Sequence, residues 1–380
     1  MPTLLEALKA SGGAVNRGGL PLHFGGTDHE ETALREGAGL SPNTWRALIE
    51  FTGRDRVKFL HNVTTNDVLK LVTGRDGGSF AKDEKVDLAA TPPGRGQFTV
   101  VPNRQGKMLA DAKLRIFEDR AWLEIDRGAL TMTLATLSGL VVSEDVQLKD
   151  RSKEFDVLRV DGPKSRDVIS QALGTVPDLA DHHFAKVGDV VVSLFNLTAA
   201  PGYDVLVPAA QSADLWKKLV EAGAKPAGFF ALETLRIENG FPRWVADMDG
   251  TVLPMEAGLD PSAISYSKGC YLGQEVIQRV KTYSEAPRAL VQVMIEPHTP
   301  TKEGGPIPTP NPGTPVLVDK QNSGKVTSLA WSRKSQGLMA LVMIKKEHKA
   351  PGTKVTLDAG AVKYPGKVSA LPWHSKYATA

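Results

Sequence analysis

The last quarter of the chain constrains its fold most, because short apolar segments alternate there with glycines and prolines. Seven prolines between positions 297 and 315 predict a connecting loop within this region. Many short strands joined by such turns favour a small closed β-barrel at the C-terminus. The expected strands cover residues 290–295, 316–318, 325–328, 338–344, 354–357 and 367–371.

A chain of 380 residues exceeds what one hydrophobic core usually covers. Before residue 286, apolar patterns of strand and helix type mix without strict alternation, which favours an α+β body of two interleaved lobes over a doubly wound parallel sheet. We therefore expect an N-terminal arm at 1–26, a body at 27–285 and a barrel domain at 286–375. Glycines, charges and a Pro-Pro pair predict a loop or hairpin insertion at 72–98.

Composition narrows the function classes. Hydrophobic residues make up 41% and charged residues 23%, as in ordinary globular proteins. Lysine and arginine total 46 against 43 acidic residues, and no run of five basic residues occurs, so charge gives nucleic-acid binding no support. The N-terminus has no signal-peptide pattern, and no apolar stretch reaches about eighteen residues, so we expect neither secretion nor a membrane partner.

Cysteine and histidine usage bears on compartment and metal binding. Cys270 is the only cysteine, so no intramolecular disulfide can form and a reducing cytoplasm is the expected location. His182 and His183 form the only histidine pair. Adjacent residues of a strand point to opposite faces, so we expect this pair at the surface and no metal site.

The most informative stretch lies between residues 229 and 280. Helical spacing of apolar residues predicts a helix from Phe229 to Asn239, ended by Gly240. Glu238 would lie on its last turn, where the helix dipole disfavours a carboxylate by roughly 0.3 to 1 kcal/mol. That placement favours a binding role, and the alternative is an ordinary solvated glutamate.

A second helix follows the octapeptide KGCYLGQE at 268–275. Cys270 would then lie just before a helix N-terminus and two residues from Lys268, and both features favour the thiolate over the thiol. The alternative is a buried, inert cysteine that packs as a small apolar residue.

This octapeptide, followed by Arg279, resembles the signature of the YgfZ-type folate-binding proteins. These are relatives of the glycine-cleavage aminomethyltransferase and are implicated in maintaining iron–sulfur cluster enzymes. The segments RIENGFPRW and LPMEAGLD before it resemble the substrate lobe of the same superfamily, and short G-x-D, F-L and T-N-D elements near residues 53–67 match its N-terminal part. The resemblance runs from about residue 30 to about residue 372.

The resemblance implies a three-domain cloverleaf around a central cavity, with tetrahydrofolate as the bound cofactor. Glu238 would hold the pterin, since one carboxylate can accept hydrogen bonds from the adjacent 2-amino group and ring N–H. Trp244 and Tyr271 could stack on an aromatic ring of folate, or they could be packing residues. The motif residues beside the folate channel would be Lys268, Cys270, Tyr271, Gln274, Glu275 and Arg279.

One feature departs from the true aminomethyltransferases. In those enzymes an aspartate after an NAxNxxKD stretch steers attack on the folate, whereas residues 123–132 here contain no matching Lys-Asp pair. Asp126 is out of register with that position. On this ground the aminomethyl reaction does not transfer directly, and whether the protein is an enzyme stays open.

Three functions compete at this point. The first is a tetrahydrofolate-binding accessory protein for iron–sulfur cluster assembly or repair, in which the Cys270 thiol acts together with an iron–sulfur protein or assembly factor. The second is a folate-dependent one-carbon transferase or demethylase, which needs a positioned acid or base. The third is a folate sensor without catalysis. All three functions assume that a pteridine lies in a central cavity, held by Glu238 and within reach of the sulfur of Cys270.

Overall fold

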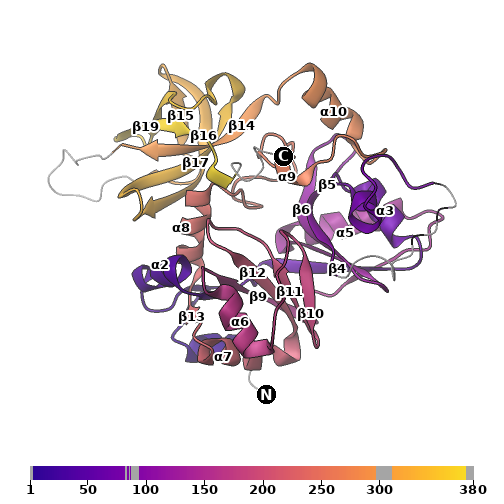
Figure 1. The fold of residues 1–380 in the computed structure, drawn as a ribbon. Helices are drawn as coiled ribbons and strands as arrows, with labels where there is room; N and C mark the ends of the chain where they lie inside the picture. The colour runs from indigo at the N-terminus through magenta and orange to yellow at the C-terminus, as the bar shows by residue number, and fades with distance from the viewer. Residues whose placement is uncertain (1–2, 82–83, 85, 87–93, 297–309, 374–380) are drawn as a thin grey trace. The chain divides into compact units, whose positions relative to one another are not determined.

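The structure is a computed structural model that describes residues 3–81, 84, 86, 94–296 and 310–373 (Figure 1). It divides into two compact units. The domain boundaries predicted from the sequence stay a prediction. The first unit comprises Met1–Arg104, Leu109–Leu232 and Ala263–Gln274, and the second comprises Gln105–Met108, Glu233–Ser262 and Glu275–Ala380.

The first unit contains a six-stranded sheet in the order β10-β11-β12-β9-β3-β13. Its neighbouring strands are antiparallel except for the parallel pair β13 and β3. The strands are β3 (Gly39–Pro42), β9 (Phe155–Asp161), β10 (Phe184–Val187), β11 (Val190–Leu194), β12 (Gly202–Pro208) and β13 (Lys225–Pro226).

A five-stranded sheet in the order β5-β6-β7-β4-β8 completes the sheet structure of this unit, apart from the short pair β1 (Ala14–Val15) and β2 (Pro21–His23). Every residue of β5 and β7 is buried, so both faces of the sheet are covered. The strands are β4 (Arg46–Thr52), β5 (Gly96–Pro102), β6 (Met108–Ile116), β7 (Ala121–Asp126) and β8 (Gln147–Asp150).

Apolar side chains fill part of the space between the two sheets. Leu48 and Trp122 from the five-stranded sheet pack with Val157, Val191 and Leu206 from the six-stranded sheet. The indole of Trp122 also lies edge-on to Phe117 and Phe155. Charged side chains occupy another part of this space and form a cluster described below.

Helices cover the other face of the six-stranded sheet. Trp216 and Leu219 of α7 (Ser212–Glu221) and Ile169 of α6 (Ser165–Leu173) pack with Val205 and Val207 of β12 in one buried cluster. The other helices of this unit before residue 229 are α1 (Leu4–Ala10), α2 (Thr27–Glu36), α3 (Arg56–Val63), α4 (Val68–Thr73), η1 (Arg127–Ala129), α5 (Leu130–Leu140) and η2 (Ala209–Gln211).

Helix α1 lies within the segment for which the sequence predicts only an arm. Thr3 and Glu6 form a capping box, in which the Thr3 hydroxyl accepts from the Glu6 amide and the Glu6 carboxylate accepts from the Thr3 amide. Leu8 is buried in the same cluster as α6 and α7. A seven-residue helix is too short to show apolar periodicity, so the cap was its only sequence signal.

The second unit consists mainly of a closed barrel in the order β14-β17-β16-β15-β18-β19, which confirms the predicted α+β class with a C-terminal β-barrel. Inward valines and isoleucines such as Val293, Val342 and Ile344 fill it. The elements are β14 (Arg288–Ile295), β15 (Pro315–Val318), β16 (Gln321–Ser332), β17 (Gly337–Lys345), η3 (Lys346–His348), β18 (Lys354–Asp358) and β19 (Lys363–Ser369).

Three helices precede the barrel strands in the sequence: α8 (Phe229–Asn239), α9 (Asp260–Ala263) and α10 (Gln274–Tyr283). The bounds of α8 agree with the predicted helix, and Gly240 follows it with a φ of 76°. The predicted loops at 72–98 and 297–315 lie in part outside the described residues.

Candidate functional site

Lys268 is buried in the first unit and is held by backbone carbonyl groups. Its Nζ donates to the carbonyl oxygens of Thr64 at 2.7 Å, of Asn66 at 3.2 Å and of His61. Helix α3 ends at Val63, so carbonyl groups there have no partner within the helix and the ammonium satisfies them. Burial lowers the pKa of Lys268 to about 7.

Cys270 lies in the loop that precedes α10, and its side chain is exposed. The loop is fixed on the side of Gly269, whose amide donates to the carbonyl of Gly78 at 2.5 Å. A Cβ at position 269 would lie 1.6 Å from the Ser79 hydroxyl, so only glycine fits. Cys270 comes four residues before the first residue of α10, and the Lys268 ammonium donates to carbonyls instead of to the sulfur.

Tyr271 is buried beside Lys268, with 4.9 Å between its ring centre and the Lys268 Nζ. Its hydroxyl is buried without a hydrogen-bond partner among the described residues, and burial raises its pKa. A buried hydroxyl of this kind is costly unless something satisfies it, so Tyr271 is the motif residue with the clearest unmet bonding need.

The remaining motif residues lie on α10. Glu275 and Arg279 form an exposed i,i+4 ion pair at 2.9 Å, whereas Gln274 is half-buried at the helix start. Exposed pairs of this spacing contribute only about 0.3 to 0.5 kcal/mol. The pair therefore supports the helix, and its predicted role beside folate stays a prediction.

Glu238 lies on the last turn of α8 in the second unit and is half-buried. The Ser332 hydroxyl of β16 donates to its Oε1 at 2.6 Å. The Gln292 side chain of β14 donates to the main-chain carbonyls of Ile237 at 2.8 Å and of Glu238 at 3.0 Å. The barrel thus satisfies the C-terminal end of α8.

Trp244 is 7% exposed and pairs with Met248 in a short bridge. The next residue, Val245, has a φ of 69° and is 70% exposed, which is unusual for a β-branched side chain. The burial of Trp244 supports the alternative of a packing residue. Its predicted stacking on folate is not tested.

Glu238 belongs to the second unit and Cys270 to the first. The prediction that both residues face one central cavity therefore stays a prediction.

A buried cluster of charges between the two sheets of the first unit escaped the sequence prediction. A sequence signal exists, because Asp111, Lys113 and Arg115 alternate along β6, which puts three charges on one face of an otherwise apolar strand. The other members lie on β4, β7, β9 and β12. They are Arg46, Glu124, Asp126, Arg159, Asp161 and Asp204.

Two carboxylates of this cluster are well compensated. Glu124 Oε1 accepts from Arg46 Nε at 2.9 Å, and Asp204 accepts from Lys113 at 2.5 Å and from Arg159 at 2.9 Å. Burial alone would raise the pKa of Glu124, but the charges of Lys113, Arg115 and Arg46 lower it. The pair of Lys113 and Asp204 connects β6 with β12 and so links the two sheets.

Two other carboxylates of the cluster are less well compensated. Burial raises the pKa of Asp161, whose Oδ2 has no hydrogen-bond partner among the described residues, although its Oδ1 accepts from Arg159 at 2.7 Å. Burial also raises the pKa of Asp111, the nearby Asp126 adds to the increase, and Arg46 offsets only part of it. The Asp111 Oδ1 is buried and has no hydrogen-bond partner among the described residues. A buried carboxyl group with a raised pKa is a candidate for proton transfer.

The prediction that the histidine pair lies at the surface is wrong for His182. Its side chain is 15% exposed and both ring nitrogens are buried, because the ring packs against Phe98 and Phe195 at centroid distances of 5.9 and 5.4 Å. Burial lowers its pKa to about 4. Among the described residues, no group of three or more histidines, cysteines, aspartates and glutamates could hold a metal ion.

None of the helices in the described part of the chain is both long and apolar enough to span a membrane.

Two parts of this chain match known protein domain families. Residues 72–268 match the family described as the GCVT N-terminal domain, and residues 288–374 match the glycine cleavage T-protein C-terminal barrel domain. The second match covers all six strands of the barrel, β14 to β19.

Individual relatives agree with these matches. An aminomethyltransferase of Halalkalibacterium halodurans is 27% identical over 96% of this chain and 95% of the relative. A chloroplastic protein of Arabidopsis thaliana, whose name gives only a provisional transferase assignment, is 27% identical over 97% of this chain and 79% of the relative.

A crystal structure supports the fold. The glycine cleavage system aminomethyltransferase T from Bartonella henselae aligns with a TM-score of 0.81 at 20% identity, over 97% of this chain and 96% of that one. At this identity the likeness shows the fold alone.

Proposed function

Because this chain belongs to the glycine cleavage T-protein family, we propose that it is a folate-dependent one-carbon transferase, with tetrahydrofolate as acceptor and Asp111 as the acid–base group. The family match extends over the body and the barrel, and the relatives named above include aminomethyltransferases. The single observation that carries the proposal is the buried Asp111 carboxyl group with a raised pKa and an unpartnered oxygen. It supplies the acid or base that the transferase hypothesis required.

The Glu238 carboxylate is compatible with a pterin. A carboxylate can accept two parallel hydrogen bonds, and a pterin presents its 2-amino group and ring N–H as two such donors. The hydrogen bonds from Gln292 to the end of α8 fix the backbone that carries this carboxylate, which reduces the ordering cost of binding.

The reaction class follows from the proton balance. An aminomethyl donor X–CH2–NH2 passes its methylene carbon to N5 and N10 of tetrahydrofolate, the C–X and C–N bonds break, and two new C–N bonds form. The two N–H protons of the acceptor leave, one to give ammonia and one to give X–H. Asp111 would receive a proton as the new bond forms and return it to a leaving group.

The buried charge cluster would support proton transfer by Asp111. Glu124 and Asp204 already neutralise the cations around them, so these cations stabilise the Asp111 carboxylate only weakly. Its proton is held more tightly than in a solvated aspartate, which brings the proton affinity closer to that of an amine. The 5% exposure of Asp111 also limits competition from bulk water.

The test is a turnover assay with purified protein, tetrahydrofolate and a panel of small aminomethyl donors. We expect 5,10-methylene-tetrahydrofolate to form, detected by coupling to its NADP-dependent oxidation, with one ammonia released for each aminomethyl group transferred. Binding of tetrahydrofolate without product from any donor would contradict the proposal and favour the sensor or accessory function.

The accessory function in iron–sulfur cluster assembly or repair remains the second candidate, because the thiol of Cys270 is exposed. An exposed thiol can exchange with the thiol of a partner protein, and one cysteine cannot ligate a cluster alone. Replacement of Cys270 separates the two functions: turnover of the transferase should survive it, whereas an accessory protein should lose its support of iron–sulfur enzymes in cells.

A further inference from the structure

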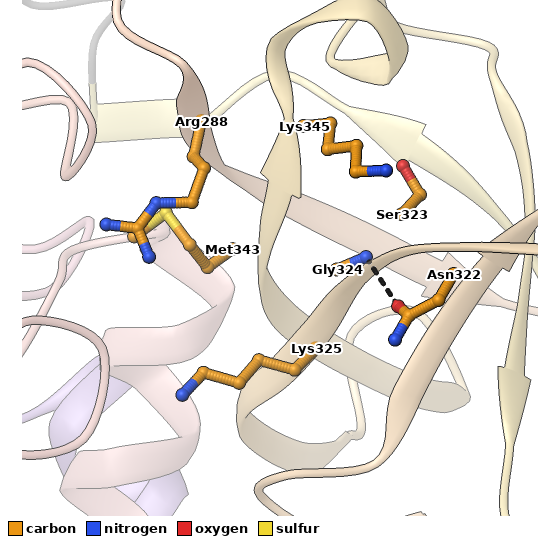
Figure 2. Close-up of a pocket in the computed structure, with 7 residues that line it drawn as sticks. All are labelled: Arg288, Asn322, Ser323, Gly324, Lys325, Met343 and Lys345. Carbon is orange, nitrogen blue, oxygen red and sulfur yellow. Dashed lines mark hydrogen bonds between the residues drawn. The ribbon is translucent and has the colours of Figure 1, made fainter.

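A pocket of about 460 Å³ lies on the outer face of the barrel, and three cationic side chains surround it (Figure 2). These are Arg288 of β14, Lys325 of β16 and Lys345 of β17. The proposed transferase reaction assigns no role to this pocket.

The strand register puts the cations together. Arg288 of β14 lies directly opposite Lys345 of β17, and Lys325 of β16 lies opposite Met343 of the same strand β17. Ile344 packs inside the barrel, so its neighbours Met343 and Lys345 face outward. Like charges at directly opposite positions destabilise a sheet, which implies that something else compensates them.

Internal partners compensate only one of the three. Glu256 accepts from Arg288 Nε at 2.7 Å and from Nη2 at 3.0 Å. For Lys325 and Lys345, the described residues show neither an ion pair nor a side-chain hydrogen bond. Lys325 also acts at longer range: burial would raise the pKa of Asp249, and hydrogen bonds from Thr251 together with the Lys325 charge lower it.

The rest of the lining supplies a neutral donor and an apolar floor. The Gly324 amide donates to Asn322 Oδ1 at 3.1 Å, which orients the carboxamide and assigns its NH2 group as the remaining donor (Figure 2). A Cβ at position 324 would lie 2.3 Å from the Met343 carbonyl, so glycine is required for this close approach. The Met343 side chain provides the apolar part of the lining.

The net charge of the C-terminal segment, residues 286–380, also favours the binding of an anion. Residues 286–380 contain 13 lysines and arginines against 5 aspartates and glutamates, a net charge of +8, whereas residues 1–285 carry −5. This asymmetry concentrates positive potential on the barrel and raises the local concentration of anions.

We propose that this pocket binds a small organic anion with at least two negative charges on phosphate or carboxylate groups. Lys325 and Lys345 neutralise the two charges, Asn322 donates a hydrogen bond, and an apolar part of the ligand contacts Met343. The volume suits a small molecule better than a single ion, and lysine ammonium groups accept phosphate and carboxylate alike.

The test is calorimetric titration of the full chain at low salt with pyrophosphate and, separately, with citrate. We expect one molecule bound per chain, and a loss of affinity of about tenfold or more in the double variant Lys325→Gln/Lys345→Gln. The probe that binds more tightly shows whether the pocket prefers phosphate or carboxylate groups. The matched control is Lys320→Gln/Lys354→Gln, two exposed barrel lysines outside the pocket, which should change the affinity less than about twofold.

A second measurement guards against a folding artefact. Without added anion, Lys325→Gln/Lys345→Gln should be at least as stable to heat as the wild type at low salt, because it removes repulsion from Arg288. Equal loss of affinity in the two double variants, or no binding of either probe, would overturn the proposal. Binding of a single-stranded RNA oligonucleotide that depends on all four lysines would overturn it too, since it would show a diffuse charge effect.

Discussion

Arg46 lies 4.0 Å from Asp111, measured from Nη1 to Oδ2, whereas its Nε donates to Glu124 at 2.9 Å. The guanidinium of Arg46 is therefore hydrogen-bonded to Glu124, and its distance from the Asp111 carboxylate is the longest that still counts as an ion pair. The nearby cations lower the pKa of Glu124, whereas burial raises that of Asp111 and Arg46 offsets only part of this increase.

We predict that Asp111→Asn lowers the turnover rate by about 10² to 10⁴, the usual contribution of a general acid or base. The amide has nearly the same shape, so the thermal midpoint should change little. The control is Asp189→Asn, an exposed aspartate of the same unit, which should retain the wild-type rate. An unchanged rate in the Asp111 variant would remove this residue from the mechanism.

We predict that Lys268→Met destabilises the protein by roughly 2 to 4 kcal/mol, because buried carbonyls of His61, Thr64 and Asn66 lose their donor. Urea unfolding measures this loss. Lys186→Met, at an exposed position on β10, should have almost no effect. If Lys268 served only to activate Cys270, its replacement would leave the stability unchanged.

We predict that His61 makes the fold sensitive to acid. Its Nδ1 accepts from the Leu69 amide at 3.3 Å, which requires an unprotonated nitrogen, and burial with the charge of Lys268 lowers its pKa from 6.5 to about 4. Between these values the unfolded chain binds more protons than the folded one. The contribution is therefore complete above pH 6.5 and is lost as the pH falls towards 4.

Urea unfolding at several pH values tests this prediction. Replacement His61→Asn should reduce the slope of unfolding free energy against pH by up to about 1.4 kcal/mol per pH unit in that window. His29→Asn, at an exposed position, should keep the wild-type slope. An identical slope in the His61 variant would show that another group accounts for acid sensitivity.

We predict that Cys270→Ser changes the unfolding free energy by less than about 0.5 kcal/mol, because the side chain is exposed. Tetrahydrofolate affinity and turnover should also stay near wild-type values. A fall in turnover would instead make the thiol part of the transfer reaction. Normal turnover with lost support of iron–sulfur enzymes in cells would establish the accessory role.

The sequence predicted the local elements well. Apolar spacing placed the helix that became α8 and the barrel strands, because each depends on residues close together in the chain. The short helix α1 escaped this approach because it has too few turns for a periodic signal. Its capping box, formed by Thr3 and Glu6, is the one signal of this helix in the sequence.

The chemistry of the site was harder to predict. Lys268 was expected beside the thiol, but its partners are carbonyls more than 200 residues earlier in the chain. The pattern along the chain does not single out Asp111, since its raised pKa comes from burial between the sheets and from the charge of Asp126 on another strand. Such properties follow from tertiary contacts, and spacing along the chain does not contain them.

Calorimetric titration with tetrahydrofolate tests the central claim most directly, through three proteins: wild type, Glu238→Ala and Ser332→Ala. We predict one binding site in the wild type and a loss of about 1.5 to 3 kcal/mol in Glu238→Ala, the scale of a charge-assisted hydrogen bond. Ser332→Ala removes the hydroxyl that donates to the same carboxylate and should bind within about threefold of wild type. Wild-type affinity in Glu238→Ala, or no binding of tetrahydrofolate by the wild type, would contradict the account.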